Sequence, residues 1–301
     1  HIKGMSFLDL TEILRRDTEK SNKIINRLEE AVTNNEVLNF LKYDFKKYRP
    51  EELTPALHRL SPLIYSETKS LSLLQPENRF DFQDFMDNGM ILLVNLASLG
   101  REHIKGMGGF ILTSLHCAVM ERLKIPPNQR KLFNIYVDEA HLFDTDATEK
   151  MMVEARKCNV SFNLAHQYLT QFKRERVDSL MTAGTTITFC VGAGDAGVMT
   201  KNYQNKTKSE EFMELGVGEA IVRVDSDIAK IKTLGPRKIT KSYRHQIIRN
   251  SHMRYCKPVQ EVRRKNKLRF RSHHNPFGNI IPEDLVRSVD SGRIGVYERY
   301  D

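Results

Sequence analysis

Four short, continuously apolar runs constrain the fold of this 301-residue chain most strongly. A continuous run, unlike an alternating one, is typical of a strand that is buried on both faces of a sheet. Segments with helical spacing separate the runs, and strands that alternate with helices form parallel sheets through right-handed crossovers. We therefore predict an α/β core with a mostly parallel sheet flanked by helices. The runs are "MILLVNLA" (90–97), "LFNIYVDEA" (132–140), "VSFNLAHQ" (160–167) and "TTITFCVG" (185–192).

The residues before this core have a different pattern. Apolar side chains keep helical spacing through residues 5–75, and no strand pattern interrupts them, which predicts an all-helical region. At the other end of the core, "EAIVRVDSDIAKIKT" (219–233) predicts a closing hairpin that turns at residues 225–227.

The character changes again after Pro236. We expect a helix over 240–256, followed by a basic, turn-rich extension. Four apolar or aromatic residues form one stripe on this helix: Tyr243, Ile247, Ile248 and Tyr255. The predicted domains are an all-helical region (1–79), an α/β core (80–236) and a basic helix and tail (237–301).

The net charge of +9 lies in the tail. Residues 237–301 hold 16 Lys and Arg against 6 Asp and Glu, whereas residues 1–236 hold 31 against 32. Such asymmetry indicates contact with nucleic acid or another acidic surface, and a merely solvated tail explains it equally well. No run approaches the roughly 18 apolar residues of a membrane span, and the first residues lack a signal-peptide pattern.

Two acidic residues, Asp138 and Glu139, follow the second apolar run. Ligands of parallel sheets gather beyond the carboxyl ends of the strands. An apolar strand followed by two acids has the form of a Walker B element. In that element the first acid holds Mg²⁺, largely through water, and the second polarises the attacking water. The structural alternative is a strand that runs into an acid-capped turn.

The letters "DEAH" (138–141) also suggest a superfamily-2 helicase. Such a helicase needs a Ser-Ala-Thr-like motif further along and a second RecA-like domain with an arginine-rich motif, and the sequence contains neither. A zinc protease would need HExxH, which is absent as well. His141 is then most simply a polar residue on the turn that follows.

Two further residues are candidates for the same site. Gln167 ends the third run, where it can sense a γ-phosphate, orient a water or simply cap the next helix. Arg156 lies near the end of a helix that begins at about Asp146. Cations are favoured there by the helix dipole alone. The functional alternative for Arg156 is an arginine finger that reaches the nucleotide of a neighbouring subunit.

Several segments, in order, resemble the C-terminal half of the type IV secretion and conjugative coupling-protein ATPases. These ATPases belong to the HerA–FtsK group of hexameric, RecA-like DNA pumps. The similar segments are "ILLVNLASLGREHIKGMGGFILTSL", "FNIYVDEAHLF", "EARKCNVSFNLAHQYLTQF" and "TAGTTITFCVGAGDA", and "IIRNSHMRYCKPVQEV" resembles the segment that commonly follows the core. The resemblance covers roughly residues 35–265.

The resemblance implies a role for each candidate residue. Asp138 and Glu139 correspond to the Walker B pair, Gln167 to the γ-phosphate sensor and Arg156 to the trans-acting finger. The implied fold is a RecA-like sheet with an all-α insertion before the Walker B half. ATP and Mg²⁺ are the implied cofactors. The implied partners are DNA bound without sequence preference, further copies in a homohexamer, and relaxase or secretion-channel proteins. The implied location is the cytoplasm, including the inner face of the cell membrane.

One departure from the family is large. A Walker A motif, G-x-x-x-x-G-K-[ST], is nowhere in the chain, because "VGAGDAG" (191–197) has glycines but no following Lys-Ser or Lys-Thr. Nucleotide affinity should therefore be poor. We expect a fragment of a DNA-translocating ATPase whose P-loop, and any membrane anchor, lies upstream of His1. The competing hypothesis is a catalytically inactive relative that recruits DNA or a relaxase.

Overall fold

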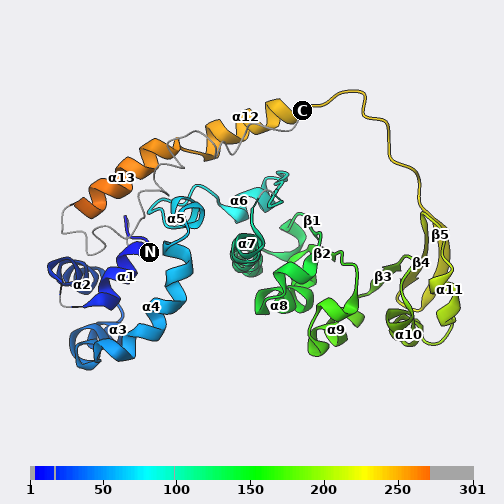
Figure 1. Ribbon diagram of the computed structural model, residues 1–301, viewed down its shortest axis with the longest axis horizontal. Coiled ribbons are helices and arrows are strands. Elements are labelled where there is room, and N and C mark those ends of the chain that lie inside the picture. Colours follow the sequence, from blue (N-terminus) through cyan, green and yellow to red (C-terminus); the bar gives the residue numbers. More distant parts are fainter. Residues whose placement is uncertain (1–3, 17, 98, 272–301) are drawn as a thin grey trace. The chain divides into compact units, whose positions relative to one another are not determined.

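The computed structural model describes residues 4–16, 18–97 and 99–271. The chain forms two compact units (Figure 1). One unit comprises His1–Glu77 together with the described residues of Gln246–Asp301, and the other comprises Asn78–His245. The chain thus leaves the first unit, builds the second and returns to the first.

The N-terminal part of the first unit is helical, as predicted, and no strand occurs among its described residues. Ser6 and Thr18 cap its first two helices, because each side chain accepts a hydrogen bond from a first-turn amide. Its core is a cluster of Ile13, Ile25, Phe45 and Leu53. The elements are α1 (Phe7–Arg15), α2 (Glu19–Ala31), α3 (Asn35–Asn39), η1 (Phe40–Asp44), η2 (Phe45–Lys47), α4 (Pro50–Ile64) and α5 (Glu67–Leu73).

Two helices, α12 (Arg244–Tyr255) and α13 (Val259–Arg271), occupy the basic C-terminal segment. The expectation of a basic, turn-rich extension over 263–278 is wrong for its described part, since residues 263–271 belong to the regular helix α13. It docks on α5 because Val262 is buried and Arg263 pairs with Glu67 at 2.7 Å. By contrast, α12 buries no residue, and Ile247 on the predicted stripe is 52% exposed. Residues 272–301 of the predicted tail lie outside the described residues.

The second unit contains helices, short 3₁₀ turns and all five strands of the described chain. None of the described helices is long and apolar enough to cross a membrane. The helices are α6 (Phe82–Asp87), α7 (Arg101–Glu121), α8 (Asp146–Glu154), α9 (Arg174–Met181), α10 (Ala193–Asn202) and α11 (Ser209–Met213). The turns are η3 (Arg122–Lys124), η4 (Pro127–Gln129), η5 (Ala140–Phe143), η6 (Ala155–Cys158) and η7 (Leu169–Gln171). The strands are β1 (Phe133–Val137), β2 (Val160–Leu164), β3 (Thr185–Thr188), β4 (Glu219–Val224) and β5 (Asp227–Lys232).

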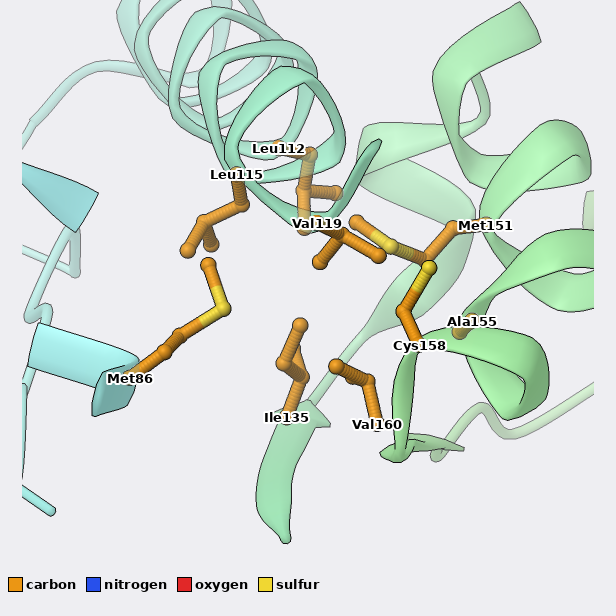
Figure 2. Close-up of a cluster of buried hydrophobic side chains, with 9 residues drawn as sticks. All are labelled: Met86, Leu112, Leu115, Val119, Ile135, Met151, Ala155, Cys158 and Val160. Atoms are coloured by element: carbon orange, nitrogen blue, oxygen red, sulfur yellow. The ribbon is translucent and has the colours of Figure 1, made fainter. Parts of the chain in front are cut away.

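Strands β1 and β2 pair in parallel, in register from Phe133 opposite Val160 onward. Helices α7 and α8 cover one face of the pair. There, Ile135 and Val160 meet side chains from both helices in the main buried cluster (Figure 2). On the other face Tyr136 is 77% exposed. The parallel sheet is therefore covered on one side only by the described residues, although the apolar runs predicted strands buried on both faces.

Strands β3, β4 and β5 form a separate antiparallel sheet. The hairpin of β4 and β5 is confirmed, with Val224 opposite Asp227 and a positive φ of 50° at Asp225. The predicted mostly parallel sheet is not found, because β3 pairs with β4 and no described strand joins it to β2. The fold is mixed α/β and mostly helical, with one small parallel and one small antiparallel sheet.

The first apolar run, 90–97, does not form the strand that its sequence predicts. Its described residues form no strand, and Ile91 and Leu93 are 85% and 75% exposed. An extended segment becomes a strand only when a neighbour satisfies its amides and carbonyls. No strand among the described residues pairs with this run. Its apolar side chains favour burial, but the described residues leave Ile91 and Leu93 exposed.

Candidate functional site

The acids Asp138 and Glu139 lie at the carboxyl end of β1, and the backbone turns sharply between them and η5. Glu139 has φ 48° and ψ 48°, a left-handed conformation that costs a non-glycine residue roughly 1–3 kcal/mol. Two hydrogen bonds continue the parallel ladder past the strand end and hold this turn. The amide of Ala165 donates to the carbonyl of Val137 at 2.9 Å, and the amide of Ala140 donates to the carbonyl of Ala165 at 2.8 Å. The ladder therefore fixes the backbone that carries Glu139.

The parallel pairing brings Gln167 beside Glu139. The Nε2 of Gln167 donates to the Oε1 of Glu139 at 2.8 Å. The side chain of Asp138 is on the same turn, and one of its carboxylate oxygens accepts from the Glu139 amide at 3.0 Å, in an exposed position. Three of the predicted site residues thus meet at one edge of the sheet.

His141 also belongs to this cluster, although its place in the sequence predicted only a polar turn residue. Its side chain is only 13% exposed, and its Nδ1 lies 3.4 Å from the Oε2 of Glu139. On the other side of the ring, Nε2 lies 3.4 Å from the Nε2 of Gln171. The ring of Phe172 meets the imidazole edge to face, with centroids 6.4 Å apart. The residues after Gln167 therefore enclose the histidine that follows Glu139.

A second histidine, His166, also meets Phe172 edge to face, with ring centroids 5.1 Å apart. Burial lowers the pKa of the His166 imidazole below its usual range, while the nearby Asp195 carboxylate acts in the opposite direction. Asp195 also accepts a hydrogen bond from the Leu169 amide at 3.1 Å. The glycine-containing "VGAGDAG" segment therefore has a structural role here. It begins α10, with Gly192 as the N-cap, and its Asp195 anchors the start of η7, two residues after Gln167.

The structure does not bring Arg156 to this cluster. Arg156 is exposed on η6, directly before β2 begins, whereas Glu139 follows the end of β1. Because the two strands are parallel and in register, these residues lie at opposite ends of the pair. At about 3.3 Å per residue, five residues separate them by roughly 16 Å along the strands. Arg156 is therefore too distant to contact Glu139 of its own chain.

The side chains at this edge could contact the Mg²⁺ shell and the attacking water of a nucleotide–Mg²⁺ complex, but they supply no P-loop for its phosphates. Asp138 offers a carboxylate suited to a water of the Mg²⁺ shell, and Glu139 with Gln167 could hold an attacking water. The described residues contain no cluster of three or more His, Cys, Asp or Glu side chains suited to a metal ion. The 301 residues also contain no P-loop to bind the phosphates. The donors present at this edge are therefore suited to the water and metal side of such a complex.

Sequence spacing alone could not have identified Gln171 and Asp195. Gln171 reaches His141 from the end of the η7 turn, and Asp195 reaches the Leu169 amide at the start of that turn from the first turn of α10. Neither contact follows a helical or strand period. The available signal for His141 is its position two residues after Glu139, which by itself predicts only a polar residue on a turn.

No protein-family model and no curated protein matches this chain. The chain is similar to the unbound monoclinic form of the bacterial conjugative coupling protein TrwBΔN70, with TM-score 0.54 and 13% identity, over 77% of this chain and 64% of that one. It also matches VirB4 of Thermoanaerobacter pseudethanolicus, with TM-score 0.41 and 15% identity, over 76% and 68% of the two chains. A third match is the genome packaging NTPase B204 from Sulfolobus turreted icosahedral virus 2 in complex with AMPPCP, with TM-score 0.39, 14% identity and coverage of 53% and 74%.

The first of these similarities establishes the fold. At 13% identity, the chain has a fold similar to that of the bacterial conjugative coupling protein TrwBΔN70. The chain spans 64% of the length of that coupling protein. What the whole protein does is therefore a matter for proposal.

Proposed function

We propose that this chain is the Walker B half of a hexameric, ATP-driven DNA-translocating motor, of the kind that couples DNA to a conjugation or type IV secretion channel. The observation that carries the proposal is the 2.8 Å hydrogen bond between Gln167 and Glu139 at the carboxyl ends of β1 and β2. A carboxylate and an amide held together at this edge are suited to positioning one water against a phosphoryl group.

Each residue has one role in this proposal. Asp138 holds Mg²⁺ largely through water, Glu139 accepts a proton from the attacking water, and Gln167 senses the γ-phosphate and orients that water. ATP supplies the phosphoryl group when it is bound. The P-loop that grips its phosphates has to come from outside the 301 residues. Arg156 completes the site of the neighbouring subunit, because its position at the opposite end of the strand pair prevents contact with Glu139 of its own chain.

The proposal includes binding partners. DNA is bound without sequence preference, the assembly is a homohexamer, and relaxase or secretion-channel proteins are further partners. The location is the cytoplasm, at the inner face of the membrane where an anchor is present. Supporting this, the exposed basic helix α12 contains Arg244, Arg249 and Arg254 and no acidic residue.

The test is a substitution in the full-length protein. Glu139→Gln should retain ATP binding and abolish hydrolysis, because the amide keeps the shape of the side chain but cannot accept the proton. Glu175→Gln, at an exposed position in the first turn of α9, is the matched control and should leave the rate unchanged. Hydrolysis within a few-fold of wild type after Glu139→Gln would remove Glu139 from the catalytic role.

The absence of a Walker A motif from these residues favours one alternative, a catalytically inactive relative that recruits DNA or a relaxase. The same experiment separates the two. The alternative predicts that the full-length protein binds DNA but hydrolyses no ATP before any substitution is made. In that case Glu139→Gln has no activity to remove.

A further inference from the structure

We propose that His141 is a positioning residue for Glu139, held by Gln171 in the tautomer that carries its proton on Nδ1. This inference rests on the proposed function for its catalytic meaning. The tautomer itself is a property of the chain that can be measured without any hydrolysis.

The orientation of the Gln171 side chain is fixed by the backbone. Its Oε1 accepts a hydrogen bond from the Tyr168 amide at 3.1 Å. A backbone N–H can only donate, so the atom facing Tyr168 must be the oxygen, and the amide nitrogen must face the other way. That nitrogen lies 3.4 Å from the Nε2 of His141.

The tautomer of His141 follows from that orientation. The amide nitrogen of Gln171 is also only a donor, so the Nε2 of His141 has to accept. In a neutral imidazole the proton is then on Nδ1, because the two ring nitrogens have opposite roles and one hydrogen bond decides both. The Nδ1–H group faces Glu139, whose Oε2 is 3.4 Å away.

The carboxylate is thereby approached by a donor on each oxygen. Gln167 donates to Oε1, and His141 directs its Nδ1–H toward Oε2. The Nδ1 atom is buried and has no hydrogen-bond partner among the described residues at its present distance. A buried polar group without a partner is unfavourable, which favours closing the 3.4 Å gap to a normal hydrogen bond. Catalytic hydrogen bonds are often long before ligands bind and shorten in the complex.

The ring is also held by packing. Phe172 meets it edge to face at an interplanar angle of 86°, and Phe172 directly follows the η7 turn that carries Gln171. The segment after β2 therefore controls both oxygens of Glu139, one directly through Gln167 and one through His141. His141 touches no reacting atom in this arrangement and acts only by orienting the carboxylate.

The experiment measures the tautomer in the ¹⁵N-labelled 301-residue chain. Long-range ¹H–¹⁵N correlation spectra distinguish a protonated from an unprotonated ring nitrogen. They are recorded at about pH 8.5, roughly two units above an unperturbed imidazole pKa. His245, which is exposed, serves as an internal reference. We expect His141 to be mainly Nδ1–H. A spectrum that shows mainly Nε2–H in the wild-type chain overturns the inference.

A variant tests the cause. Gln171→Glu keeps an oxygen for the Tyr168 amide but replaces the donor near the Nε2 of His141 with an acceptor. His141 should then change to mainly Nε2–H, and an unchanged tautomer would refute control by Gln171. In the full-length ATPase the same variant should lower kcat and leave the KM for ATP nearly unchanged, the signature of impaired orientation rather than impaired binding.

The two proposals can fail separately. An Nδ1–H tautomer in a protein that hydrolyses no ATP keeps the structural inference and removes the proposed function. Hydrolysis that needs Glu139 in a protein whose His141 is mainly Nε2–H does the reverse.

Discussion

Gly108 in α7 lies against Phe143 of η5, the turn that follows Glu139, so a side chain at position 108 should disturb the packing of this turn. A Cβ atom added at Gly108 would stand 2.1 Å and 2.2 Å from two ring carbons of Phe143, the last residue of η5. Carbon atoms in contact are normally about 3.5–4.0 Å apart. Gly108→Ala therefore forces either the helix or the Phe143 ring to move. The ring packs against the main core cluster, which limits its freedom to yield.

The size of the effect follows from two opposing contributions. An extra methyl group in a packed site typically costs about 1–3 kcal/mol. Alanine gains about 0.8–1.0 kcal/mol over glycine in a helix interior. Because two ring carbons would be more than about 1 Å too close, the upper part of the cost range applies, and the expected net destabilisation is about 1–2 kcal/mol. At roughly 2–4 °C per kcal/mol for a unit of this size, Tm should fall by several degrees.

The matched control is Gly197→Ala in α10, where an added Cβ meets nothing within 4 Å. There only the helix propensity acts, so stability should rise by about 1 kcal/mol. Thermal unfolding of the 301-residue chain measures both variants. Adding Phe143→Leu to Gly108→Ala should restore part of the stability, since the smaller side chain vacates the ring positions. A rise in Tm for Gly108→Ala, like that expected for Gly197→Ala, would refute the clash with Phe143.

Three further predictions concern the assembly, the basic segment and the first apolar run. Arg156→Ala in the full-length hexamer should lower kcat by on the order of 10³. Mixing it with Glu139→Gln subunits should restore some activity, and no recovery despite verified mixing argues against action in trans. Arg249→Gln on exposed α12 should flatten the dependence of log K for DNA on log[salt] by roughly 0.7–0.9 for each phosphate that is no longer neutralised. Arg263→Gln should not change that slope, because Arg263 already pairs with a carboxylate. If residues 90–97 pair with a neighbouring strand only in the assembly, their backbone amides should exchange rapidly with solvent in the 301-residue chain and slowly in the assembly, and equal rates would refute that pairing.

The meeting of Gln167 with Glu139 was predictable because it depends on a rule that sequence carries. Consecutive apolar runs joined by a helix pair in parallel, so the residues that follow them meet at one edge. The structure has that pairing and that hydrogen bond. The catalytic roles of these residues stay predictions. By contrast, the enclosure of His141 by Gln171 depends on the course of one short turn and on the direction of an amide, and no periodicity in the sequence encodes either.

The antiparallel pairing of β3 was missed for a related reason. The run at 185–192 has the same continuous apolar pattern as the run that forms β2, and this pattern does not specify which neighbour a strand will pair with. The pairing is set by the hairpin that follows, whose first strand lies against β3. The sequence predicts the hairpin itself. It does not predict that the first strand of the hairpin pairs with β3 in the antiparallel direction.

Three features of the second unit have one physical cause. Residues 90–97 form no strand, Tyr136 is exposed on the uncovered face of β1, and β2 has a strand on one edge only in the described part of the chain. Parallel sheets are stable when both faces are covered, and a strand edge left open offers its amides and carbonyls to any extended partner. A sheet of two strands cannot satisfy sequences suited to burial on both faces. The apolar runs are therefore typical of a larger sheet with both faces covered, and the proposed P-loop half is the kind of element that would complete it.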